Sequence, residues 1–130
     1  MNTKGSKRVI FCSTLLIACI ATFNTSASDD FDRLYAQAKT EMNSEFGAFY
    51  TMQLNSEIGE NHANVLDNCT KKHKNSEKQL FSAIFEINSD GIIKAFHIDK
   101  KTGFAACLKS RFVGLEVPMP PYDGYLSPFN

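Results

Sequence analysis

Residues 80–99 read LFSAIFEINSDGIIKAFHID, and this stretch decides the fold. Its first part, residues 80–87, contains the aromatic and β-branched residues that favour strands. Residues 88–91, Asn-Ser-Asp-Gly, form a turn signal, because Asp-Gly supplies the positive φ that a tight hairpin needs. Residues 92–99 then return with a similar composition. The stretch therefore predicts an antiparallel β-hairpin.

The returning strand has an irregular apolar pattern. Ile93 and Phe96 are three residues apart, whereas Phe96 and Ile98 are two apart. A β-bulge near residues 94–95 would bring all three side chains onto one face. A regular strand with Ile92, Phe96 and Ile98 inward is the alternative, and the pattern leaves both open.

Helical patterns precede the hairpin. Apolar residues recur at helical spacing over residues 28–42, and the pattern is predicted to continue through residues 46–53 despite Gly47. Asn61 is predicted to cap a second helix, whose core side carries Cys69.

A further helix is predicted after the hairpin. Thr102 can cap this helix, and Gly114 ends it. Residues 118–121, Pro-Met-Pro-Pro, then break regular structure. Proline cannot donate to a strand ladder, so residues 125–129, which include Pro128, are expected to form an edge strand or an extended tail.

The predicted elements make one α+β domain. Their order is N-terminal helices, an antiparallel β-hairpin, a helix and a short edge strand. A chain of 130 residues has room for one core, and no repeat or linker divides it. We expect a single domain over residues 28–130, with residues 28–58 as its N-terminal helical extension.

Residues 1–27 are predicted to be a secretory signal peptide. The first eight residues carry three basic and no acidic side chains, and an almost uncharged stretch follows over residues 9–23. That stretch is shorter than the roughly 20 residues that span a bilayer, which disfavours a membrane anchor. We expect cleavage after Ala27, a periplasmic mature protein and no membrane span after cleavage.

A second cleavage site overlaps the signal peptide. Residues 16–19, Leu-Ile-Ala-Cys, resemble a bacterial lipobox, in which Cys19 would be lipidated and become the first residue. The following residues 20–23 are unusually apolar for the start of a lipoprotein. Ordinary cleavage is favoured, and a lipoprotein anchored at Cys19 is the alternative.

Cleavage leaves two of the four cysteines. Cys69 and Cys107 then remain as one pair in an oxidising compartment, where disulfides persist. On the chain-entropy model, closing their loop could stabilise the fold by up to about 4 kcal/mol. A metal site that includes Cys69 and His73 is disfavoured, since close pairs such as C-x-x-C are absent. We therefore predict a helix-to-helix disulfide and no metal.

Charge and motifs exclude several functions. The chain has 14 basic and 14 acidic residues, and removal of the signal peptide takes away three basic ones, leaving a net charge of −3. This balance disfavours nucleic acid as the partner. The sequence has no G-x-S-x-G or other nucleophile motif and no glycine-rich phosphate loop. We expect no catalytic residue and no cofactor, and we predict that the protein is not an enzyme.

A longer pattern runs through the second half of the chain. It is F-x-I-x-x-D-G-x-I-x-x-F-x-I over residues 85–98, then Thr102-Gly103, a helix, and P-x-P-P over residues 118–121. This order resembles the TonB-like C-terminal domain and, more narrowly, its stand-alone, disulfide-bearing relatives. The resemblance covers about residues 60–130. The chain departs from the energy-transducing members, because it shows neither a membrane anchor nor a long Pro-rich linker.

The resemblance implies a small α+β module of the cell envelope that binds proteins, often by strand addition at a sheet edge. We expect a periplasmic module that acts by protein–protein contact on an unidentified envelope or secreted protein. The most specific form of this hypothesis is that the protein is an immunity-type antagonist of a toxin. A lipid-anchored structural or assembly component of the envelope is the alternative.

The Pro-rich tail is the best candidate for a contact surface. Prolines preset an extended backbone at low entropy cost, and Met with Tyr supplies adaptable apolar area. A rigid lid packed on the domain's own helices is the alternative. The candidate contact residues are Pro118, Met119, Pro120, Tyr122 and Tyr125.

Overall fold

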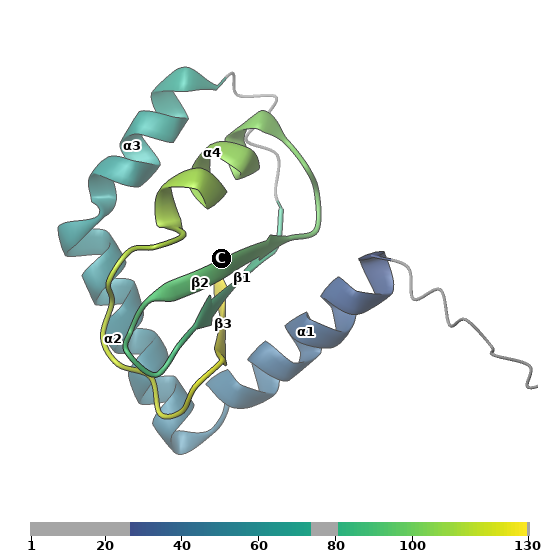
Figure 1. The fold of residues 1–130 in the computed structure, drawn as a ribbon, viewed down its shortest axis with the longest axis vertical. Helices are drawn as coiled ribbons and strands as arrows, with labels where there is room; N and C mark the ends of the chain where they lie inside the picture. The colour runs from purple at the N-terminus through teal and green to yellow at the C-terminus, as the bar shows by residue number, and fades with distance from the viewer. Residues whose placement is uncertain (1–26, 74–80, 130) are drawn as a thin grey trace, which may run out of the picture.

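The computed structural model describes residues 27–73 and 81–129. The elements in chain order are α1 (Ala27–Met42), α2 (Glu45–Asn61), α3 (Ala63–Lys72), β1 (Ala83–Ile87), β2 (Ile93–Ile98), α4 (Gly103–Phe112) and β3 (Tyr125–Phe129). A three-stranded antiparallel sheet lies in the middle, with α1 against one face and α2, α3 and α4 on the other (Figure 1). The predicted α+β class is confirmed.

The predicted hairpin joins β1 and β2. Gly91 in its turn has a φ of +78°, the left-handed region that favours glycine. A methyl group there would also collide with the carbonyl oxygen of Val117. The backbone therefore requires glycine at this position for two separate reasons.

The predicted β-bulge lies in β2. The pairing with β1 shifts by one residue between Ala95 and Ile93, and Lys94 between them has no partner in the ladder. The shift brings the three apolar side chains of this strand to the core side of the sheet. The bulge is confirmed, and the alternative of a regular strand with Ile92 inward is wrong.

Four phenylalanine rings form the centre of the core, one each from β1, β2, α4 and β3. Every ring contacts the other three, with ring centroids 5.1 to 5.7 Å apart. Buried side chains of α2 and α3 complete this core, so α2 is an integral part of the fold. The rings belong to Phe85, Phe96, Phe112 and Phe129.

The opposite face of the sheet packs on α1. Ala38 of α1 is fully buried against Ile84 of β1 and Leu126 of β3, and partly buried apolar residues of α1 surround them. Residues 28–58, predicted as a helical extension, thus supply one layer of the domain and part of the main core.

The predicted first helix is two helices. Ser44 lies between them and caps α2, because its Oγ accepts a hydrogen bond from the Gly47 N–H at 3.0 Å. The break rotates the second segment, so Phe46 and Phe49 are 75% and 57% exposed instead of inward. The predicted continuation of the apolar stripe through residues 46–53 is wrong, because it assumed one unbroken helix.

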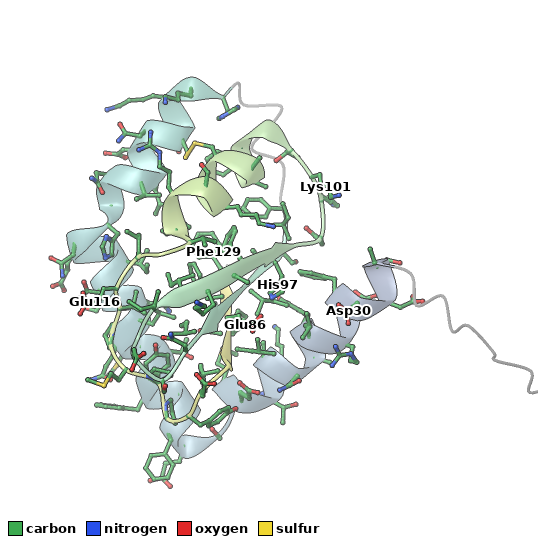
Figure 2. The ribbon with its side chains drawn as sticks, viewed as in Figure 1. Asp30, Glu86, His97, Lys101, Glu116 and Phe129 are labelled. Carbon is green, nitrogen blue, oxygen red and sulfur yellow. A yellow bond between two sulfur atoms is a disulfide. The ribbon has the colours of Figure 1, made fainter. Side chains whose placement is uncertain are left out.

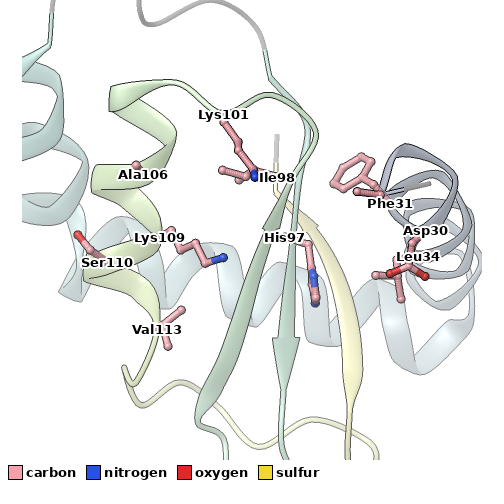
Figure 3. Close-up of a pocket in the computed structure, with 11 residues that line it drawn as sticks. Asp30, Phe31, Leu34, His97, Ile98, Lys101, Ala106, Lys109, Ser110 and Val113 are labelled. Carbon is pink, nitrogen blue, oxygen red and sulfur yellow. The ribbon is translucent and has the colours of Figure 1, made fainter. Parts of the chain in front are cut away.

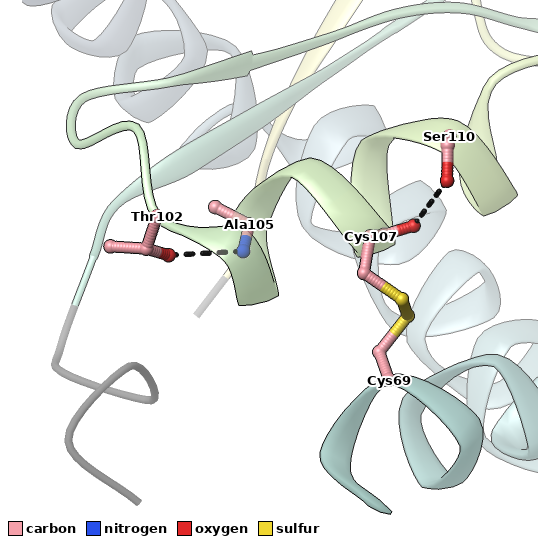
Figure 4. Close-up of a disulfide and its surroundings, with 5 residues drawn as sticks. All are labelled: Cys69, Thr102, Ala105, Cys107 and Ser110. Carbon is pink, nitrogen blue, oxygen red and sulfur yellow. Dashed lines mark hydrogen bonds between the residues drawn. A yellow bond between two sulfur atoms is a disulfide. The ribbon is translucent and has the colours of Figure 1, made fainter. Parts of the chain in front are cut away.

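Two of the three predicted helix boundaries are confirmed. The Oγ1 of Thr102 caps α4 by accepting from the Ala105 N–H at 3.1 Å (Figure 4). Gly114, with a φ of +91°, follows the end of this helix. The Asn61 cap is wrong by one residue: Asn61 ends α2, and His62 precedes α3 without a side-chain capping bond.

The predicted disulfide joins Cys69 of α3 to Cys107 of α4 (Figure 4). Their Cα atoms are 5.7 Å apart, within the range that a disulfide spans. The bond ties two helices that lie on the same face of the sheet, and the prediction is confirmed.

The predicted signal peptide and Cys19 lie outside the described residues, apart from Ala27, which begins α1. Within residues 27–73 and 81–129, no helix is both long and apolar enough to cross a membrane.

The tight junction between α1 and α2 yields a first prediction. Gly47→Ala should lower the free energy of unfolding by about 2 kcal/mol, because the added methyl group would collide with the carbonyl oxygen of Glu41. Gly59→Ala, in the same helix, is the matched control. A methyl group there meets no atom, so this change should raise the free energy of unfolding by roughly 0.5 kcal/mol. Urea unfolding followed by circular dichroism measures both, and equal effects would contradict the account.

The disulfide yields a second prediction. The double variant Cys69→Ala/Cys107→Ala should lose about 2–4 kcal/mol of unfolding free energy, because its unfolded chain regains the freedom of a loop with a sequence separation of 38. Denaturant unfolding with and without a reductant measures this. The reductant should destabilise the natural protein by a similar amount and leave the variant unchanged. An unchanged midpoint for fully reduced natural protein would refute the prediction.

Candidate functional site

The outer edge of β3 is closed to a further strand. Pro128 has no N–H to donate. Leu126 stands two residues earlier and has the same orientation in the ladder, so its N–H also points away from β1. That N–H donates instead to Glu41 Oε2 of α1 at 2.8 Å. Residues 125–129 thus form the predicted edge strand, and its outward donors are missing or used.

The first part of the β2 edge is also closed. The segment that follows α4 lies along it and exchanges backbone hydrogen bonds with it. The Ile93 N–H donates to the Leu115 carbonyl at 3.0 Å, and the Gly114 N–H donates to the Ile93 carbonyl at 2.8 Å. The Val117 N–H donates to the carbonyl of Gly91 at 2.7 Å. Residues 114–117 therefore cover the edge as far as the bulge.

No described strand pairs with the outer side of the second part of β2. The Asp99 N–H donates to the carbonyl of Ser82, just before β1, at 3.1 Å. This bond shows which residues of β2 direct their N–H and C=O groups toward β1. In a strand, residues two apart direct their backbone groups to the same side, so the N–H and C=O groups of His97 and Ala95 also face β1. Phe96 and Ile98 then point their N–H and C=O groups away from the sheet. Phe96 is 0% exposed as a whole residue, so its outward groups are enclosed by the chain, whereas Ile98 is only partly buried.

A groove of about 750 Å³ lies at the end of β2, where His97 and Ile98 line it, and we call it the edge groove. It lies between α1 on one side and α4 on the other, as Figure 3 shows. The α1 wall is largely apolar, whereas the α4 wall and the loop before α4 carry lysines. The residues that the argument uses are Phe31, Leu34, Ile98, Lys101, Lys109 and Val113.

The ionisable groups of the edge groove divide into paired and unpaired sets. Asp30 accepts from Arg33 at 2.7 Å, on its own helix. The Nε2 of His97 lies 2.8 Å from Glu86 Oε2 across the β1–β2 ladder (Figure 2). Lys101 and Lys109 form no ion pair with any described residue. The unpaired charge of the groove is thus positive and lies on the side of α4.

The Pro-rich tail is partly exposed and partly packed. The Tyr50 Oη of α2 donates to the Pro118 carbonyl at 2.7 Å, which fixes the tail against the domain. Met119 and Tyr122 are 75% and 47% exposed, whereas Pro120 is half-buried. Both tail interpretations thus hold in part: it is anchored like a lid, and two of its side chains face solvent.

Tyr125 is misplaced among the predicted contact residues. Its side chain is 1% exposed and contacts the rings of Tyr50 and Tyr122, at centroid distances of 4.9 and 5.4 Å. It faces inward because it pairs with Ile87, which points into the main core. The prediction that Tyr125 meets a partner is wrong for the folded chain.

These tyrosines favour their neutral forms. Burial raises the pKa of Tyr50, and the nearby charge of Tyr125 raises it further. The pKa of Tyr122 is also raised, by desolvation first and then by its hydrogen bond with Glu41. The carboxylate that closes the β3 edge therefore also helps to hold the tail.

No family model, curated protein or solved structure matches this chain. The resemblance to the TonB-like C-terminal domain stays a prediction.

The described residues offer little for metal or covalent chemistry. In residues 27–73 and 81–129, no three His, Cys, Asp or Glu side chains gather where they could hold a metal ion. Both described cysteines are in the disulfide, so neither sulfur is available as a ligand or nucleophile. What the structure places together is a groove at the end of β2 with an apolar wall and a lysine-bearing wall, an arrangement suited to binding.

The edge groove was not predicted from the sequence. Its walls come from residues 27–34 and 106–113, which are far apart in the chain and meet only across the sheet. Lys101 and Lys109 look like ordinary surface residues in the sequence. The one available signal was the hairpin itself, since a two-stranded unit with a single further strand must leave an outer edge.

The tyrosine cluster yields a pH prediction. Because the pKa of Tyr50 is raised in the folded state, its contribution to stability is complete below about pH 10 and is lost as the pH rises above that value. The free energy of unfolding should therefore fall more steeply between about pH 9 and 11 for the natural protein than for Tyr50→Phe. Urea unfolding across this range measures both slopes. Parallel slopes would show that Tyr50 ionises equally easily in both states.

Proposed function

We propose that the protein is an exported binding module that acts by protein–protein contact in the cell envelope. One observation carries the proposal: a groove between α1 and α4 lies at the end of β2, at Ile98. The rest of the described sheet edge is covered, so the end of β2 at this groove is where main-chain groups can be reached. A groove between two helices is accessible to a slender segment and sheltered from a large flat surface.

The binding mode is strand addition. An extended segment of the partner lies in the edge groove and pairs with the outward N–H and C=O groups of Ile98. Main-chain bonds supply affinity at this position without demanding particular side chains. The walls formed by α1 and α4 then contact alternate side chains of the added strand.

Export is supported by two independent features. The predicted signal peptide directs the chain out of the cytoplasm. The Cys69–Cys107 disulfide is stable in an oxidising compartment, such as the periplasm, and would be reduced in most cytosols.

Site-specific crosslinking in cells that export the protein tests the proposal. A photoreactive phenylalanine analogue at Val113, in the edge groove, should give a discrete crosslinked product with an envelope or secreted protein. The same analogue at Asn64, exposed on α3, is the matched control and should give none. Equal crosslinking from both sites, or from neither, would contradict the groove as the binding site.

A pair of substitutions isolates the role of the backbone. Ile98→Pro removes an N–H that points into the groove, and edge strands tolerate proline in this orientation. Ile98→Ala removes a similar amount of side chain and keeps the N–H. Strand addition predicts that the proline variant loses the crosslink from Val113 and that the alanine variant retains most of it. Thermal unfolding of both variants confirms that they are folded.

A further inference from the structure

Three large apolar side chains of α2 lie on the surface of the protein. Phe46, Phe49 and Met52 are 75%, 57% and 62% exposed. Residues three positions apart are neighbours on the surface of a helix, so the three side chains form one apolar patch. A single exposed apolar residue is ordinary, whereas a contiguous apolar patch marks an interaction site.

The patch belongs to a face of α2 that points away from the core. Tyr50, Leu54 and Ile58 occupy the opposite side of the helix and are buried in the main core. The outward residues follow one another at intervals of four, three, four and four, the spacing of a seam between two packed helices. This surface, which we call the α2 outer face, comprises exposed residues only: Glu45, Phe46, Phe49, Met52, Ser56 and Glu60.

Both ends of the α2 outer face are acidic. Glu45 and Glu60 form no ion pair with a described residue, and Glu60 accepts a hydrogen bond from the Ser56 Oγ at 2.8 Å. The remaining acid of α2, Glu57, lies 3.6 Å from His62 Nε2. The helix contains no lysine or arginine. Its outer face is therefore complementary to positive charge.

The charge pattern selects among the possible occupants of this face. A second copy of the chain would place glutamate beside glutamate at both ends, whichever way the two helices ran, and such like-charge pairs are destabilising. Helices that lie in a membrane surface carry lysine and arginine on their polar side, and α2 has neither. A basic helix would cover the apolar middle and neutralise both ends.

We propose that the α2 outer face binds an amphipathic helix of another protein, with lysine or arginine at both ends of an apolar stripe. The stripe packs on Phe46, Phe49 and Met52, and the cations meet Glu45 and Glu60. No residue of α2 lines the edge groove, so this is a second surface and the inference goes beyond the proposed function.

A synthetic helix tests the proposal. The probe has 17 residues, the length of α2, with leucines along one side, lysines in its first and last turns, a hydrocarbon staple on the other side and a fluorescent label. Control peptides carry glutamine or glutamate in place of the lysines. Fluorescence anisotropy should show that the Lys peptide binds the natural protein about fivefold more tightly than the Gln peptide, with the Glu peptide weakest. The methyl NMR resonance of Met52 should shift on binding.

Charge-matched variants locate the effect. In Glu45→Gln/Glu60→Gln the preference for the Lys peptide over the Gln peptide should disappear, whereas Asp67→Asn/Glu116→Gln, at exposed positions outside α2, should keep it. Phe49→Ser should weaken the binding of the Lys peptide at least tenfold, because it removes the aromatic side chain at the centre of the face. Circular dichroism checks that all three variants are folded.

Three peptide results would overturn the proposal: equal binding of the Lys and Gln peptides to the natural protein, a preference that survives Glu45→Gln/Glu60→Gln, or no binding of either peptide. A dimer in sedimentation that Phe49→Ser dissociates would also overturn it, because a second copy would then cover the face. Binding to phosphatidylcholine vesicles that Phe49→Ser abolishes would overturn it in favour of a lipid surface. The crosslink from Val113 tests the edge groove separately, so failure here is distinct from failure of the proposed function.

Discussion

Mutual contact of four phenylalanine rings holds the sheet together and fixes α4 against it. Each ring comes from a different element. Any movement of one of the three strands or of α4 would therefore separate aromatic surfaces that are in contact. Such pairs contribute about 0.5–1.5 kcal/mol each beyond the burial of their area. The disulfide anchors α4 a second time, to α3. A wall of the edge groove is therefore rigid, which reduces the entropy lost when a partner binds.

The chain closes its sheet edges by three local devices. Pro128 removes a donor from β3, Glu41 occupies the neighbouring donor, and the segment after α4 pairs with the first part of β2. The bulge at Lys94 marks the end of the part of β2 that this segment covers. The burial of Phe96 continues this protection, and β2 reaches the edge groove only at His97 and Ile98.

The features that the sequence predicted correctly are those with local causes. The hairpin follows from Asp90-Gly91, the α4 cap from Thr102, and the disulfide from two cysteines in an exported chain. The errors arose where contacts between residues far apart in the sequence determine the structure. Gly47 allows α1 and α2 to meet closely, a contact that a single helical period does not reveal. Tyr125 was grouped with the exposed tail, but its pairing with β1 turns it inward. The edge groove joins segments that only the folded sheet brings together.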